Sequence, residues 1–196
     1  MDDYYIEGEE RFGRFTTSFY NVIAWRMLKK LYNFALEEFN GINPKTILDI
    51  GAGPGKLTIM VAKKYENAKI YAIDPSKYMV EVEKKNFKKE NIDCNCAQGS
   101  SREIPFENKF DLIYTTLSFH HWKRQEESIS HILSKLNING YFIIIEFLNE
   151  YYKSNVSQHK KHSLSKEYSE SLNFEDYEKT MDTQNNLIAL KFKRIK

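Results

Sequence analysis

The sequence predicts an α/β protein in which a mostly parallel sheet carries helices on both faces. Short apolar runs alternate with segments of helical periodicity between about residues 45 and 147, which is typical of βαβ units. A glycine-rich turn at residues 51–55 separates the first apolar run from the helix that follows it. Two strand-like segments close the chain with only residues 181–185 between them. So short a linker admits a hairpin but no crossover helix, and one closing strand is therefore expected to run antiparallel.

The first helix is predicted over residues 18–39, where apolar side chains recur every three or four positions. Asn40-Gly41 is expected to end it, and Pro44 forbids its continuation. A buried strand is predicted at 46–50. The helix after the glycine-rich turn is predicted at 56–64.

The second strand is predicted at residues 69–74, where an apolar run ends in an acid. Ser76 is expected to cap a helix that continues to about Lys89. Residues 92–97 alternate in polarity like a third strand, and the apolar run at 110–115 predicts a fourth.

The last crossover helix is predicted from the apolar spacing of residues 129–136, with Asn139-Gly140 as its end. Residues 141–145 form the most apolar run and are expected to be a central strand. A polar and basic stretch at 148–172 follows. The strands of the closing hairpin are predicted at 173–180 and 186–193.

Composition indicates one globular domain. The 196 residues include 29 Lys+Arg against 27 Asp+Glu, for a net charge of +2, and 41% are hydrophobic. This balance argues against a dedicated nucleic-acid binder. No apolar run approaches the roughly 20 residues that cross a bilayer, and the first residues lack the apolar region of a signal peptide, so we expect a cytoplasmic protein. The C-x-C spacing of Cys94 and Cys96 suits free thiols rather than zinc ligands, and no metal site is expected.

The glycine-rich turn and two acids limit the class of ligand that the site can bind. A dinucleotide fingerprint needs its third glycine at position 56, where this chain has Lys56. Asp49 stands two residues before the first glycine, where a carboxylate would repel a pyrophosphate and favour a cationic amine. Asp74 ends the second strand, where a carboxylate can accept both hydroxyls of a ribose. An amine, a ribose and no phosphate describe S-adenosylmethionine better than NAD.

The chain resembles the class I S-adenosylmethionine-dependent methyltransferases, most of all the small-molecule group related to quinone-biosynthesis C-methyltransferases. The resemblance implies a doubly wound, Rossmann-like sheet of seven strands in the order 3-2-1-4-5-7-6, with strand 7 antiparallel. The residues that carry the resemblance are 47–55, 73–76, Met79, 99–106, 110–113, 120–122 and 136–146.

The resemblance also implies roles for single residues. Asp49 would hold the methionine amine, Asp74 the ribose hydroxyls, and Met79 would pack on the adenine. Ser100 stands where the family usually has an acid for the adenine amine. Residues 115–118 would line the methyl-donor pocket. The complete set implied for cofactor binding is Asp49, Gly51, Ala52, Gly53, Asp74, Pro75, Met79, Gly99, Ser100 and Thr115.

Candidates for the acceptor side are fewer. His120, at the end of the fourth strand, is either a general base or substrate contact, or a structural histidine. His121 and Trp122 are expected to start the next helix and pack there. Phe15 and Tyr20, from an aromatic N-terminal segment, are candidate substrate contacts. The basic residues between 153 and 166 form either a solvated loop or a lid.

These observations favour a methyltransferase that uses S-adenosylmethionine, releases S-adenosylhomocysteine and methylates a small molecule. The alternatives are an RNA or protein methyltransferase that docks through the basic stretch, and a protein that binds the cofactor without catalysis; a dinucleotide-dependent oxidoreductase ranks last. The prediction is a single domain, 1–196. Its parts are an N-terminal aromatic segment and helix (1–44), a cofactor-binding core (45–147), a polar insert (148–172) and a C-terminal hairpin (173–196).

Overall fold

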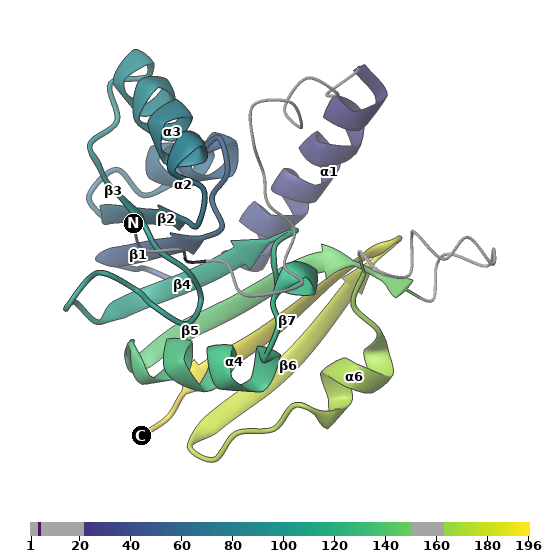
Figure 1. Cartoon of the computed structure of the whole chain (residues 1–196). Coiled ribbons are helices and arrows are strands. Elements are labelled where there is room, and N and C mark those ends of the chain that lie inside the picture. The colour runs from purple at the N-terminus through teal and green to yellow at the C-terminus, as the bar shows by residue number, and fades with distance from the viewer. Residues whose placement is uncertain (1–3, 5–21, 150–162) are drawn as a thin grey trace.

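One mixed sheet of seven strands organises the protein, with strand order β3-β2-β1-β4-β5-β7-β6 (Figure 1). The computed structural model describes Tyr4 and residues 22–149 and 163–196. Strands β1 to β5 pair in parallel, whereas β7 pairs antiparallel with both β5 and β6. The predicted strand order and the antiparallel seventh strand are confirmed. The strands are β1 Thr46–Ile50, β2 Lys69–Asp74, β3 Cys94–Gln98, β4 Phe110–Thr116, β5 Leu136–Phe147, β6 Tyr177–Gln184 and β7 Leu187–Arg194.

Helices cover both faces of this sheet (Figure 1). Leu31 and Phe34 of α1 and Val61 of α2 belong to one buried apolar cluster. Ile129 and Ile132 of α4 belong to a second cluster on the opposite face. The described helices are α1 Val22–Glu38, α2 Lys56–Lys64, α3 Lys77–Lys89, α4 Gln125–Ser134 and α6 Lys166–Ser171, and a 3₁₀ turn, η2, spans Phe119–His121. In the described part of the chain, no helix is long and apolar enough to cross a membrane.

The prediction for the segment after α4 is wrong in one respect. Leu136 begins β5 and pairs with Phe110 instead of ending the helix, and Asn139-Gly140 lies inside this strand. Asn139 takes a left-handed φ of 65°, and a Cβ on Gly140 would stand 2.9 Å from the Phe110 carbonyl oxygen. The dipeptide therefore makes an irregularity within a strand, where the register with β4 also shifts.

The closing hairpin is tighter than predicted. Asn185-Asn186 forms its turn, and residues 181–184, expected in the linker, belong to β6. β6 is an edge strand that is exposed over most of its length, so its polar composition resembles that of a loop. Strand β3 likewise begins two residues later than predicted, at Cys94. Cys94 and Cys96 are free thiols, as expected.

Candidate active site

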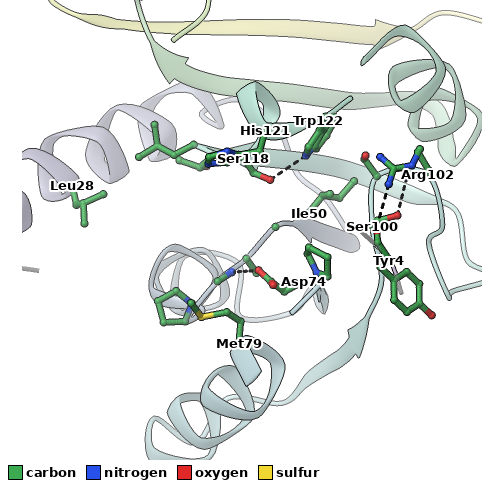
Figure 2. A pocket seen from close by; sticks show the side chains of 18 of the residues that line it. Tyr4, Leu28, Ile50, Asp74, Met79, Ser100, Arg102, Ser118, His121 and Trp122 are labelled. Atoms are coloured by element: carbon green, nitrogen blue, oxygen red, sulfur yellow. Dashed lines mark hydrogen bonds between the residues drawn. The ribbon is translucent and has the colours of Figure 1, made fainter. Parts of the chain in front are cut away.

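A cleft opens at the carboxyl ends of the parallel strands, the edge at which open α/β sheets bind ligands. Its lining comes from the loops after β1, β2, β3 and β4 and from the α1 side chains Leu28 and Tyr32. The cleft has a volume of about 1020 Å³, which includes the solvent-filled space at its open entrance. Figure 2 shows Leu28 at one end, Arg102 and Tyr4 at the other, and Ser118 and Trp122 facing Asp74 and Met79 across the middle.

The glycine-rich turn has left-handed φ values of 74° at Gly51, 56° at Gly53 and 74° at Gly55. The amides of Gly51 and Ala52 donate to the Ile73 carbonyl at 2.8 and 3.1 Å, which ties the turn to the end of β2. A Cβ on Gly51 would stand 2.2 Å from the Ser118 hydroxyl oxygen, so no side chain fits there. At Gly53 a Cβ would meet nothing within 4 Å, because this backbone borders the cleft.

Asp74 presents a fixed carboxyl group to the cleft. Its Oδ1 accepts from the Ser76 amide at 2.8 Å, and its Oδ2 accepts from the Gly53 amide at 2.9 Å. Burial raises the pKa of Asp74 to about 6, although the two amide hydrogen bonds oppose that shift. The Ser76 hydroxyl caps α3 by accepting from the Met79 amide, as predicted, and so holds Met79 at the cleft wall.

Asp49 lies beneath the glycine-rich turn and does not line the cleft. The residue is 3% exposed, and its carboxyl group accepts a hydrogen bond of 2.6 Å from the Thr58 hydroxyl of α2. Desolvation raises its pKa to about 7, opposed by the Thr58 bond and reinforced by the charge of Asp74. Any influence of Asp49 on a ligand therefore acts through the turn rather than by direct contact.

The predicted cofactor residues divide into two groups. Gly99, Thr115 and Asp49 are set back from the cleft: a Cβ on Gly99 would stand 2.8 Å from the Pro105 ring, and the Thr115 hydroxyl donates to the Ile50 carbonyl at 2.8 Å. Because side chains alternate along β4, its neighbour Thr116 lines the cleft instead. Phe15 and Tyr20 lie outside the described residues. The predicted residues that do line the cleft are Gly51, Ala52, Gly53, Asp74, Pro75, Met79 and Ser100.

The two histidines after β4 point in different directions, and the position of His120 agrees with the second of its two predicted roles, a structural histidine. His120 turns away from the cleft, and its Nδ1 donates to the buried Glu146 at 2.8 Å. His121 and Trp122 do not begin a helix, since α4 starts at Gln125; both line the cleft. The Trp122 indole nitrogen donates to the Ser118 hydroxyl at 3.1 Å (Figure 2).

Arg102 is the lining residue that sequence reasoning missed most completely. Its guanidinium donates to the Tyr4 carbonyl at 3.1 Å, and Tyr4 also lines the cleft. Ser101, also missed, bonds through its hydroxyl to Ser128 at 2.9 Å. Both residues directly follow Ser100, which was predicted to bind the cofactor. Their position in the loop after β3 is the sequence feature that could have predicted them as lining residues.

Comparison with known proteins agrees with this geometry. Residues 47–140 match the sequence profile of a methyltransferase domain family. An uncharacterized methyltransferase of Staphylococcus carnosus is 33% identical over 155 residues, which cover 78% of this chain and 67% of that protein. The chain belongs to the class I S-adenosylmethionine-dependent methyltransferases. Its cofactor is therefore S-adenosylmethionine.

More distant relatives of this methyltransferase act on different acceptors. Malonyl-[acyl-carrier protein] O-methyltransferase of Priestia megaterium is 31% identical over 53% of this chain and 37% of its own. Demethylmenaquinone methyltransferase of Thermus thermophilus is 22% identical over 64% of this chain and 54% of its own. The methyltransferase thus spans between about a third and a half of the length of these two relatives.

Solved structures share the fold of the methyltransferase. A Methanococcus maripaludis protein proposed to be an S-adenosyl-L-methionine-dependent methyltransferase superposes with a TM-score of 0.78, at 21% identity, over 98% of both chains. The plantazolicin methyltransferase BamL, in complex with a triazolic desmethylPZN analogue and SAH, superposes with a TM-score of 0.75, at 13% identity, over 88% of both chains.

Proposed function

We propose that this methyltransferase methylates a small-molecule acceptor that enters the same cleft as the cofactor. The observation that carries the proposal is the division of the cleft. One wall is the glycine-rich turn with the Asp74 carboxyl group; Trp122 faces it, and the apolar Leu28 and Leu117 and the ring of Tyr32 complete this second part of the lining. The polar wall suits the cofactor, which leaves the apolar side for the acceptor.

The polar wall fits S-adenosylmethionine in the residues it offers. Asp74 can accept the two ribose hydroxyls, because its carboxyl group reaches the cleft edge already oriented by two amides. Gly51 and Gly53 provide backbone where a side chain would clash or would fill the space of a ligand. Met79 and Pro75 offer apolar contact to the adenine, and Ser100 a hydroxyl at its edge.

S-adenosylmethionine supplies a methyl group already activated on a sulfonium sulfur. The chain then has to hold the acceptor's attacking atom in line with that methyl group and to exclude water. Trp122 is 9% exposed and is held by Ser118, which gives the cleft a fixed aromatic wall. Leu28 and Tyr32 bring the surface of α1 against the same space.

Titration calorimetry with S-adenosylhomocysteine tests the cofactor half of this proposal. Asp74→Asn is expected to weaken binding at least tenfold, since a charge-assisted pair of hydrogen bonds is replaced by weaker ones (roughly 1.5–3 kcal/mol). Asp182→Asn, in the exposed edge strand β6, is the matched control and should bind like the parent. Equal affinities for Asp74→Asn and the parent would contradict the assignment.

A labelled-methyl screen tests the acceptor half. The protein is incubated with S-adenosylmethionine carrying a labelled methyl group and a fractionated cell extract, and the label is followed into small molecules, RNA and protein. We expect the label in the small-molecule fraction. Label in RNA or protein would transfer the function to a macromolecular acceptor, and tight cofactor binding with no transfer to any fraction would indicate a non-catalytic protein.

A further inference from the structure

Glu146 is a fully buried carboxylate at the end of the apolar strand β5. It accepts two hydrogen bonds from one residue: the His120 backbone amide donates at 3.3 Å and the His120 Nδ1 at 2.8 Å. The His120 side chain is itself only 8% exposed. Two apolar side chains of similar volume in place of Glu146 and His120 would avoid the cost of desolvating polar groups. The pair is therefore better explained by the residues that it orients than by a gain in folding stability.

This pair fixes the 3₁₀ turn Phe119–His121 in both backbone and side chain. The next ring along the chain, His121, lies with its centroid 3.9 Å from that of His120. The His121 amide donates to the Ser118 carbonyl at 3.0 Å, which closes the turn against the end of β4. His120 points inward to Glu146, and His121 lines the cleft on the wall that carries Ser118 and Trp122 (Figure 2).

His121 is the only histidine among the described residues that line the cleft. The charged lining residues lie elsewhere: Asp74 is the last residue of β2, and Arg102 follows β3 and bonds to Tyr4. In the strand order, β4 and its following turn lie on the far side of β1 from those two strands. Ser118, at the start of this turn, stands against Gly51 of the glycine-rich turn. His121 therefore lies at the border between the cofactor-binding wall and the space that this wall leaves for the acceptor.

We propose that His121 hydrogen-bonds the methyl acceptor and that Glu146 and His120 are positioning residues that hold it there. This inference rests on the proposed function. It narrows the acceptor to a molecule with a hydroxyl or ring N–H group on an otherwise apolar body, because Leu28 and Leu117 line the cleft on that side. The imidazole of His121 is the polar group such a molecule would meet.

The location of His121 is tested by acylating histidines with diethyl pyrocarbonate and quantifying each site by mass spectrometry. Saturating S-adenosylhomocysteine is expected to slow labelling of His121 severalfold. His131, on α4 and outside the cleft, is the internal control and should label at the same rate with and without ligand. Calorimetry on the same sample separates the two hypotheses. Without binding, the proposed function fails; with binding but no protection of His121, this inference fails.

The positioning role is tested with Glu146→Gln, which keeps the shape of the side chain and removes its charge. In this variant S-adenosylhomocysteine should no longer slow the labelling of His121, just as it does not slow that of His131. The affinity for S-adenosylhomocysteine should stay within twofold of the parent. His120→Asn, which removes the ring but keeps an N–H donor, is a second route to the same loss should Glu146→Gln fail to fold. Glu38→Gln, which breaks the 2.7 Å pair with Lys191 on the other face, should leave protection unchanged. Full protection of His121 in both Glu146→Gln and His120→Asn would refute the role.

The acceptor contact is tested in the labelled-methyl assay. His121→Phe is expected to abolish transfer and to keep the parent's affinity for S-adenosylhomocysteine, whereas His131→Phe should change neither. Undiminished transfer by His121→Phe would overturn the contact.

Discussion

At the scale of single residues, two acids hold protons that respond to a ligand: Asp74 at the cleft wall, and Asp49 behind the glycine-rich turn, which a ligand reaches only by its charge. Burial raises the pKa of Asp49 to about 7 and that of Asp74 to about 6. A ligand with a cationic amine and two ribose hydroxyls favours the charged form of both, since the amine attracts a carboxylate and the hydroxyls donate to one.

Binding of S-adenosylhomocysteine should therefore release protons at mildly acidic pH. With these pKa values about one proton in total is carried by the two acids at pH 6.5, and almost none at pH 8.5. We expect release of about one proton at pH 6.5, falling toward zero at pH 8.5. Titration calorimetry in buffers of different ionisation enthalpy measures this number. Asp49→Asn should reduce the release, and proton uptake at pH 6.5 would contradict the argument.

A second residue-scale prediction concerns Gly51. Gly51→Ala places a Cβ where Ser118 already lies, in addition to the strain of an alanine at a φ of 74°. Gly41→Ala, at a φ of 82° and with nothing within 4 Å, carries the strain alone, about 1–2 kcal/mol. We expect Gly51→Ala to lose more unfolding free energy in urea and to bind S-adenosylhomocysteine at least tenfold more weakly.

Removing the clashing atoms provides the control. The double variant Gly51→Ala with Ser118→Gly frees the space that the new Cβ needs but loses the Ser118–Trp122 hydrogen bond, so it should be more stable than Gly51→Ala and less stable than Gly41→Ala. If the double variant is no more stable than Gly51→Ala alone, the steric account is wrong.

At the residue scale, the sequence predicts which backbone segments border the cleft better than it predicts which way a side chain points. Gly51, Gly53 and Asp74 were located from spacing alone because a turn between a strand and a helix has few geometries. His120 and His121 are adjacent in the chain, and which of them faces the cleft depends on Glu146, 26 residues away. Local sequence does not contain that contact.

At the scale of elements, the central strands β1, β2 and β4 were predicted to within one residue, since apolar runs bounded by polar residues leave little freedom. The bounds of β6 and the start of β5 differ from the predicted ones, because tertiary contacts rather than local sequence determine where these strands begin and end. β6 is polar and becomes a strand only by pairing with β7, and Leu136 continues the helical spacing of α4 but pairs with Phe110.

Lys179 on β6 provides a test of such an edge contact. Its ammonium group donates to three carbonyls at and beyond the end of α6, those of Ser169, Glu170 and Leu172, at 2.9, 2.8 and 2.7 Å. Lys179→Met keeps the aliphatic stem and removes all three donors, so we expect a loss of about 1–3 kcal/mol of unfolding free energy in urea. Lys88→Met, exposed on α3, is the control; an equal loss in both would attribute the effect to net charge.

At the scale of the whole molecule, one buried acid, Glu83, does not line the cleft, so ligand binding does not explain why it is buried. Glu83 of α3 is fully buried behind Gly55, and in the described part of the chain neither carboxylate oxygen accepts a hydrogen bond. Burial, with the nearby Cys96, Asp49 and Asp74, raises the pKa of Glu83 to about 10. The folded protein therefore holds a proton there at neutral pH that the unfolded chain, with an ordinary carboxyl pKa near 4.5, releases.

Folding stability must then fall as the pH rises above about 4.5, because the native state binds more protons than the unfolded state. Asp49 and Asp74 act in the same direction up to about pH 7. Glu83→Gln removes the largest contribution to this pH dependence. The unfolding free energy of the variant should exceed that of the parent at pH 8 and approach it at pH 5. The advantage of the variant over the parent should be roughly 2–5 kcal/mol larger at pH 8 than at pH 5. Urea denaturation at both pH values measures this, with Glu178→Gln on exposed β6 as the control. A Glu83→Gln protein whose stability depends on pH as strongly as the parent's would show that Glu83 is ionised in the folded state.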